Sequence, residues 1–160
     1  MGPGECARSF GKYCKGTVMV DTLVLTSSLF IIPINLAAQT GKWDLMNVFI
    51  FLMGTSWVHH SNMHLQVQRQ NIYSKIDVFA CYLAIMYTFI WAFLWSHMFY
   101  YYLACLSGVT IMHFTDHCDE IYFYKRGLVN YRCHVKHILM HVFACMGFII
   151  ISLETPVHIY

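Results

Sequence analysis

Two pairs of polar residues at helical spacing stand in otherwise apolar stretches of the chain, and their types suit metal chemistry. Ser56 and His60 are four residues apart in the segment SWVHH, and His137 and His141 are four apart in HILMH. Side chains at this spacing project from one face of an α-helix. Asp77, in the segment YSKID, is the carboxylate best placed to work with them.

Three imidazoles that leave a fourth position open form a catalytic zinc site, in which the metal lowers the pKa of its water towards 7. Such a site also needs outer groups that orient the imidazoles and a group that moves the proton. Asp77 suits either task. Spacing alone leaves the choice of imidazoles open, because His59 and His134 stand beside the two pairs.

Each of these residues also has a plainer explanation. A single histidine near a helix end is commonly an interfacial residue. Ser56 could bond back to the carbonyl four residues earlier, and Asp77 could be a carboxylate that the dipole favours near a helix N-terminus. These separate explanations do not predict that the residues lie at the same depth in several helices. The helices that carry the residues, and their orientation, therefore decide between a metal site and the plainer explanations.

The composition indicates a membrane protein. The 160 residues are 58% hydrophobic and 11% charged, with a mean hydropathy of +0.52, whereas a soluble domain of this size carries more charge. A net charge of +2 without a basic stripe excludes nucleic acid as a partner. The seven cysteines show no CxxC spacing and do not resemble a disulfide framework.

Five stretches come close to the roughly 20 residues that a helix needs to cross a bilayer. They predict an all-α polytopic membrane helix bundle over residues 17–153, between a cytosolic N-terminal segment 1–16 without a signal peptide and a short tail 154–160. We expect Pro33 to kink the first helix, and a tight turn at Ser96 and His97 to join the third and fourth. The five stretches are Thr17–Ala38, Trp43–His60, Lys75–Trp95, Met98–Phe114 and His134–Leu153.

The distribution of Lys and Arg predicts the orientation. Nine of the ten precede the first helix or lie between the second and third or the fourth and fifth, and only Lys42 falls on the other side. Positive loops stay in the cytosol, so the N-terminus is expected there and the C-terminus outside or in a lumen. The motif residues Ser56, His60, Asp77, His137 and His141 then share the cytosolic ends of three helices.

The linear pattern resembles the signature of the CREST superfamily, which includes alkaline ceramidases, progestin and adipoQ receptors, and myomaker-like proteins. The step from His60 to Asp77, with SKID before the third helix, is similar to the adipoQ-receptor branch, and TSSLFIIPINLAA followed by a helix ending in HH is similar to the myomaker-like branch. The resemblance implies zinc bound by His60, His137 and His141, with Ser56 and Asp77 acting around the metal-bound water. His59 stays an adjacent alternative.

The chain departs from that superfamily in length. Its members typically have seven transmembrane helices, whereas the stretch between Asp77 and His137 is too short for four more helices. The sequence therefore indicates a shortened, five-helix version of the fold. A cavity for a lipid chain is then incomplete in one copy, and a homo-oligomer would be one way to complete it.

Two features lie outside the motif. The segment HFTDHCDE, His113 to Glu120, could bind a metal or add a ligand to the first site, although a solvated helix end explains it as well. Asp21, about one turn into the first helix, could cap that helix, pair with Lys15 or approach the site.

These observations lead to three functional hypotheses. The first is a zinc-dependent, ceramidase-like membrane hydrolase that cleaves an amide or ester bond of a lipid, with Ser56 and Asp77 as catalytic residues. The second is a non-enzymatic protein, either receptor-like or a fusion or interaction factor, in which zinc only ties helices together. A proton or ion pathway is the third and is disfavoured, because the outer halves of the helices carry no continuing chain of polar residues.

Overall fold

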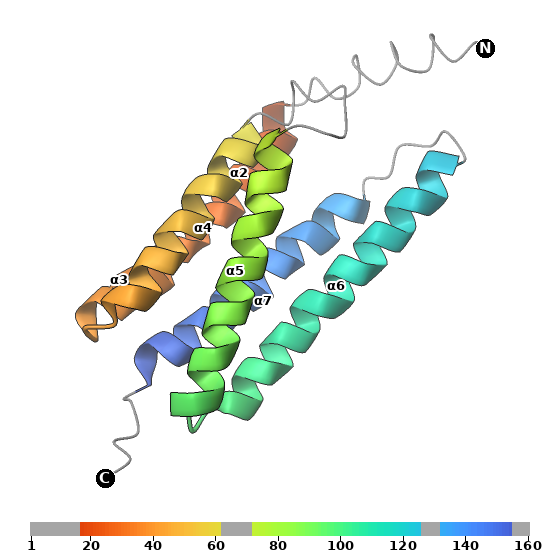
Figure 1. Ribbon diagram of the computed structural model, residues 1–160. Helices are drawn as coiled ribbons and strands as arrows, with labels where there is room; N and C mark the ends of the chain where they lie inside the picture. Colours follow the sequence, from red (N-terminus) through yellow and green to blue (C-terminus); the bar gives the residue numbers. More distant parts are fainter. Residues whose placement is uncertain (1–16, 62–71, 126–131, 155–160) are drawn as a thin grey trace, which may run out of the picture.

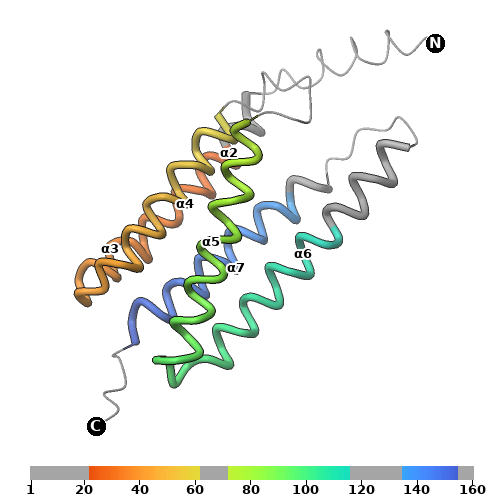
Figure 2. The backbone as a smooth tube through the Cα atoms, viewed as in Figure 1, coloured from red at the N-terminus to blue at the C-terminus, as the bar shows by residue number. Residues whose placement is uncertain are grey.

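The computed structural model describes the backbone of residues 17–61, 72–125 and 132–154, and the side chains of 22–61, 72–115 and 135–154. The predicted segment 1–16 and the tail from residue 155 lie outside it. Within the described ranges the regular structure is entirely helical (Figures 1 and 2), which confirms the all-α prediction. The elements are α2 (Thr17–Ser27), the short 3₁₀ helix η1 (Ser28–Phe30), α3 (Ile31–Gln39), α4 (Trp43–Ser61), α5 (Ile72–Trp95), α6 (Phe99–Lys125) and α7 (Arg132–Leu153).

The first predicted helix is built from three consecutive pieces, α2, η1 and α3. In a continuous α-helix the ring of Pro33 would clash with the carbonyl four residues earlier, that of Leu29, and it has no N–H to bond to that carbonyl. The helix changes to 3₁₀ geometry at this point, over Ser28–Phe30. The Leu29 carbonyl instead accepts a hydrogen bond from Cys145 Sγ of α7, at 3.4 Å. The irregularity expected from Pro33 therefore also gives α7 a contact with the first helix.

The turn between α3 and α4 depends on Gly41. Its φ of +72° places it in the left-handed region that glycine occupies without steric cost. The Gly41 amide donates to the Ala38 carbonyl at 3.2 Å and the Lys42 amide to the Ala37 carbonyl at 2.8 Å, which is the Schellman pattern of helix termination. This turn directs α4 back along α3.

Lys42, the one basic residue predicted on the outer side, caps the end of α7. Its Nζ donates to the carbonyl oxygens of Ile151 at 2.7 Å and Ser152 at 2.8 Å, and also to the carbonyl of Glu154. The last carbonyls of a helix have no partner within it, and a cation there also complements the dipole. Burial lowers the pKa of the Lys42 amino group, and the carboxylates of Glu154 and Asp44 partly offset this effect.

The same end of the bundle holds the predicted tight turn between α5 and α6. The Glu154 carboxylate accepts hydrogen bonds from the amides of His97 and Met98, the latter at 3.0 Å, and from the Ser96 hydroxyl. These groups lie directly before α6, where amides without helical partners favour a carboxylate. The α3–α4 turn, the α5–α6 turn and the end of α7 are thus joined by Lys42 and Glu154.

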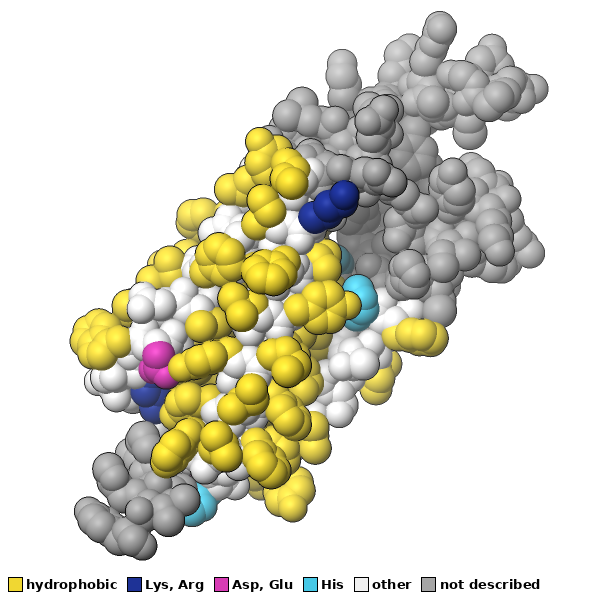
Figure 3. All heavy atoms as spheres, in the orientation of Figure 1, with side chains coloured by type: hydrophobic (Ala, Val, Ile, Leu, Met, Phe, Trp, Pro, Cys, Tyr) yellow, Lys and Arg dark blue, Asp and Glu magenta, His cyan; other side chains and the backbone are white. Residues whose placement is uncertain are grey.

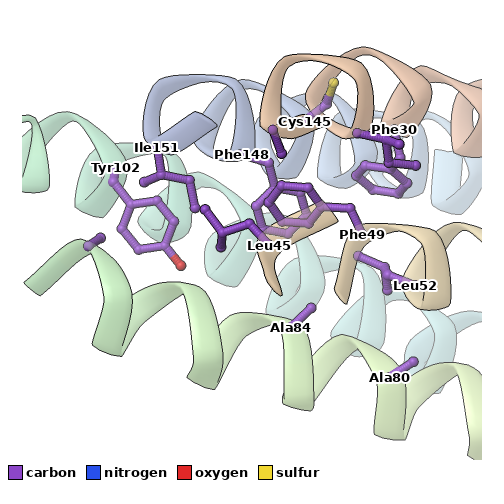
Figure 4. Packing of buried hydrophobic residues seen from close by; sticks show 13 residues of the cluster. Phe30, Leu45, Phe49, Leu52, Ala80, Ala84, Tyr102, Cys145, Phe148 and Ile151 are labelled. Atoms are coloured by element: carbon purple, nitrogen blue, oxygen red, sulfur yellow. The ribbon is translucent and has the colours of Figure 1, made fainter. Parts of the chain in front are cut away.

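The hydrophobic core runs between these helices (Figure 4). Phe49 of α4 stacks on Phe148 of α7 with ring centroids 4.5 Å apart, and Phe30 lies 5.7 Å from Phe148. Helix α5 faces the core with small side chains, among them Ala80 and Ala84, which let helices approach closely. The core cluster comprises Phe30, Ile34, Ala37, Leu45, Phe49, Leu52, Ala80, Ala84, Ala92, Tyr102, Cys145, Phe148 and Ile151.

Among the described residues, three helical stretches are long and apolar enough to cross a membrane, namely Thr22–Gln39, Ile72–Trp95 and Val135–Leu153. Hydrophobic side chains cover most of the described surface seen in Figure 3. On α5, Phe79 and Phe93 are more than 60% exposed, as expected of side chains that face lipid. These features fit a membrane protein.

The predicted helix limits lie within two residues of the observed ones, except at two places. Helix α5 begins at Ile72, three residues before the predicted start at Lys75. Helix α6 continues to Lys125, well past the predicted end at Phe114. The backbone of the segment HFTDHCDE therefore lies within a continuing helix and not at a helix end.

Candidate metal centre

Three histidine side chains from two helices meet near one end of the bundle. His60 of α4 and His137 and His141 of α7 each offer one ring nitrogen, and these three nitrogens lie within 4.8 Å of one another. The ring centroids are 5.0 Å apart for His60 and His137, 5.3 Å for His60 and His141, and 4.9 Å for His137 and His141. His60 is fully buried and His141 is 8% exposed.

The burial pattern of α4 selects His60 over its neighbour. The buried residues of this helix follow one stripe at helical spacing, and Ser56 and His60 are its last two members. His59 lies beside that stripe, half-buried, with its ring centroid 5.0 Å from that of His60. Among the described residues, the grouping of possible ligands contains His60 and not His59.

The donor set fits a zinc ion. Zinc accepts imidazole nitrogens at about 2.0–2.1 Å in a tetrahedron, which separates two ligand atoms by roughly 3.4 Å. The three nitrogens, which lie within 4.8 Å of one another, could come to that separation through small rotations of the rings. Three histidines also leave one position open, as in catalytic zinc sites. The chemistry of the donors and their grouping thus permit the metal that the sequence predicts.

Ser56 points towards the first helix. Its Oγ lies 3.0 Å from Oγ of Ser27, and both residues are buried. Ser27 in turn donates to the Leu23 carbonyl at 2.9 Å. The hydroxyl of Ser56 therefore links α4 to α2. The plainer explanation, a bond to a carbonyl of its own helix, does not account for this contact.

Asp77 lies in the second turn of α5, because that helix begins earlier than predicted. The residue is 7% exposed, and its carboxyl group lies near the side chain of Thr55, the residue before Ser56. Its Oδ1 atom is buried and has no hydrogen-bond partner among the described residues. Such an oxygen needs an explanation, for which a bound water or ion is a common one. The structure thus brings Asp77 to the turn of α4 that carries Ser56.

Thr26 of α2 touches the site, and the sequence did not single it out. Its Oγ1 lies 3.0 Å from Nδ1 of His141, and it donates to the Leu23 carbonyl at 3.0 Å. The only signal in the sequence is a run of three hydroxyl residues, Thr26 to Ser28, within an apolar stretch.

Several predicted candidates fall where side chains are not described. The side chains of Asp21, of His134 and of residues 116–120 in the segment HFTDHCDE lie outside the described residues. His113, the first residue of that segment, is exposed on α6 and is not in the grouping with His60.

Comparisons with known proteins add nothing to the resemblance that the motif suggests. A scan against family models and searches of curated proteins and of solved structures gave no match to this chain.

Proposed function

We propose that this chain is a zinc-dependent membrane hydrolase that cleaves an amide or ester bond in a lipid. The observation that carries the proposal is the convergence of His60, His137 and His141, which each bring one ring nitrogen to within 4.8 Å of the other two. In this proposal, zinc bound by these residues supplies Lewis acidity and a water of lowered pKa. The proposal keeps the ligand set that the resemblance implied.

Ser56 and Asp77 take the catalytic roles in this proposal. If the Ser27 hydroxyl gives its hydrogen to the Leu23 carbonyl, the hydroxyl of Ser56 donates to Ser27 across the 3.0 Å contact. The oxygen of Ser56 then keeps lone pairs with which to accept a hydrogen bond and orient a water. Asp77 has a buried oxygen without a partner among the described residues, and it moves the proton during bond cleavage.

A lipid substrate follows from the position of the site. His60 lies in the last turn of α4 and His137 in the second turn of α7, whose apolar stretch continues to Leu153. A reaction centre at the end of apolar helices lies where acyl chains meet headgroups. The positive residues of the sequence assign this end to the cytosolic side.

The first experiment measures metal content. The purified full chain in detergent is expected to hold one zinc per chain, and His137→Ala is expected to lose it. His97→Ala is the matched control, because His97 is exposed at the opposite end of the bundle. An unmodified protein without stoichiometric zinc, or a His137→Ala variant with unchanged zinc, would contradict the proposal.

A second candidate function, structural zinc in a non-enzymatic membrane protein, is favoured by one observation. The ligands come from α4 and α7, so a metal would tie together two helices that otherwise meet through large side chains such as Phe49 and Phe148. Asp77→Asn separates the two functions. For the hydrolase, it is expected to keep zinc and fold but to lose turnover of ceramides, lysolipids or glycerolipids. If the unmodified, zinc-loaded protein turns over none of these lipids, the structural role is favoured.

A further inference from the structure

The first helix supplies a hydrogen bond to one of the three imidazoles. Thr26 Oγ1 lies 3.0 Å from His141 Nδ1, and the same hydroxyl donates to the Leu23 carbonyl at 3.0 Å. His141 is 8% exposed and Leu23 is 2% exposed, so little bulk water competes for these groups. The two contacts form a chain of hydrogen bonds from a backbone carbonyl to an imidazole.

The direction of this chain fixes the proton on His141. A threonine hydroxyl has one hydrogen, and a carbonyl oxygen can only accept. If Thr26 gives its hydrogen to the Leu23 carbonyl, its oxygen accepts a hydrogen bond from Nδ1 of His141. In that arrangement Nδ1 carries the proton, and Nε2 keeps the lone pair that a metal needs. The bond that one ring nitrogen makes sets which nitrogen binds metal.

Threonine suits this task better than serine in a helix. Its two heavy atoms on Cβ restrict χ1, and the bond from Oγ1 to a carbonyl three residues earlier selects one of the remaining rotamers. The oxygen of Thr26 is thus held in place before any metal arrives. Its partner ring comes from α7, 115 residues later in the chain.

We propose that Thr26 is a positioning residue for the metal centre, which holds His141 as the Nδ1–H tautomer and directs Nε2 of that ring at the metal. This inference rests on the proposed function, because it assumes that His141 is a ligand. It assigns one residue of the outer shell to α2, a helix that contributes none of the three ligands. The plainer alternative is that the contact only packs α2 against α7.

Zinc affinity of the full chain in detergent separates these two explanations. Thr26→Val keeps the shape of the side chain but removes its hydrogen bonds, and it is expected to weaken zinc binding about 10- to 100-fold, as loss of an outer-shell partner does. Thr26→Ser restores the hydroxyl and is expected to restore most of the affinity. Thr110→Val on α6 is the matched control, because the Thr110 hydroxyl bonds only the Leu106 carbonyl of its own helix in the described contacts.

The outcomes distinguish this inference from the proposed function. If the unmodified protein and Thr110→Val bind no zinc, both proposals fail. If they bind zinc and Thr26→Val binds it with the same affinity, only the role of Thr26 is overturned. Equal losses for Thr26→Val and Thr26→Ser would also overturn it, because packing and not the hydroxyl would then be responsible.

A second measurement does not depend on a variant of Thr26. Nitrogen-15 NMR of histidine-labelled, metal-free protein reports which ring nitrogen carries the proton, and His141→Gln identifies the resonance that belongs to His141. A protonated Nδ1 on His141 supports the inference. A protonated Nε2 with Nδ1 unprotonated would overturn it.

Discussion

A fully buried imidazole such as that of His60 is costly for a helix to keep unless it has partners. Within the three-histidine grouping, His60 is the single contribution of α4, whereas α7 contributes two residues. We therefore expect His60→Ala to abolish stoichiometric zinc binding and His59→Ala to retain it. Metal analysis of both purified variants tests this expectation. If only His59→Ala lost zinc, the ligand would be His59 and not His60.

The sequence could pair residues but could not choose between neighbours. Helical spacing alone brought Ser56 and His60 onto one face, and the structure places both on the buried stripe of α4. The sequence could not separate His60 from His59, because α4 is apolar on most sides and its sequence does not mark the face that turns inward. Thr26 could not be identified from the sequence for a different reason. Its value depends on a contact with His141, and a single sequence does not contain tertiary contacts.

At the scale of elements, the contact between α6 and α7 depends on glycine. A Cβ built on Gly108 would lie 2.9 Å from the ring of Phe143 in α7, closer than real Cβ contacts. We predict that Gly108→Ala lowers the free energy of unfolding by about 1–3 kcal/mol, the usual cost of overpacking. Thermal unfolding in detergent measures the change.

Gly54 of α4 provides the matched control, because nothing lies within 4 Å of a Cβ built there. Gly54→Ala should leave the unfolding temperature unchanged or raise it slightly, since alanine favours helix over glycine. Equal destabilisation by both substitutions would mean that the α6–α7 distance does not depend on Gly108.

Helix limits were predictable to the extent that hydropathy follows helix formation. The turn at Ser96 and His97 was located correctly, because polar residues there interrupt two apolar stretches. The end of α6 was not, because hydropathy falls after Phe114 while the helix continues to Lys125. Hydropathy reports which residues suit lipid, whereas backbone hydrogen bonding, which polar residues also support, decides where a helix ends.

At the scale of the whole molecule, the two ends of the bundle carry different types of polar residue. One end carries the three histidines, and the other is closed by Lys42 and Glu154, which bind the ends of α7 and α6. We predict that Lys42→Met lowers the free energy of unfolding by about 2–3 kcal/mol, because it leaves buried carbonyls of α7 without a charged donor. Lys75→Met, which removes an exposed charge, should have little effect. Thermal unfolding of the two variants gives the comparison.

The arrangement of the helices also extends the membrane prediction beyond the three most apolar stretches. Helix α4 packs against α5 and α6 packs against α7 (Figure 1), so a bilayer crossed by Ile72–Trp95 and Val135–Leu153 also surrounds their neighbours. We therefore predict that the chain crosses five times and that its termini lie on opposite sides. With the positive residues distributed as they are, we expect the histidine end on the cytosolic side.

This orientation is testable without any assumption about zinc. An Asn-x-Thr acceptor appended to the C-terminus through a flexible linker is expected to be glycosylated in microsomes, whereas the same acceptor at the N-terminus is expected to stay unmodified. The unmodified chain without an appended acceptor gives the baseline. Modification at both ends would mean an even number of crossings, and modification at the N-terminus alone would reverse the orientation and place the histidine site on the lumenal side.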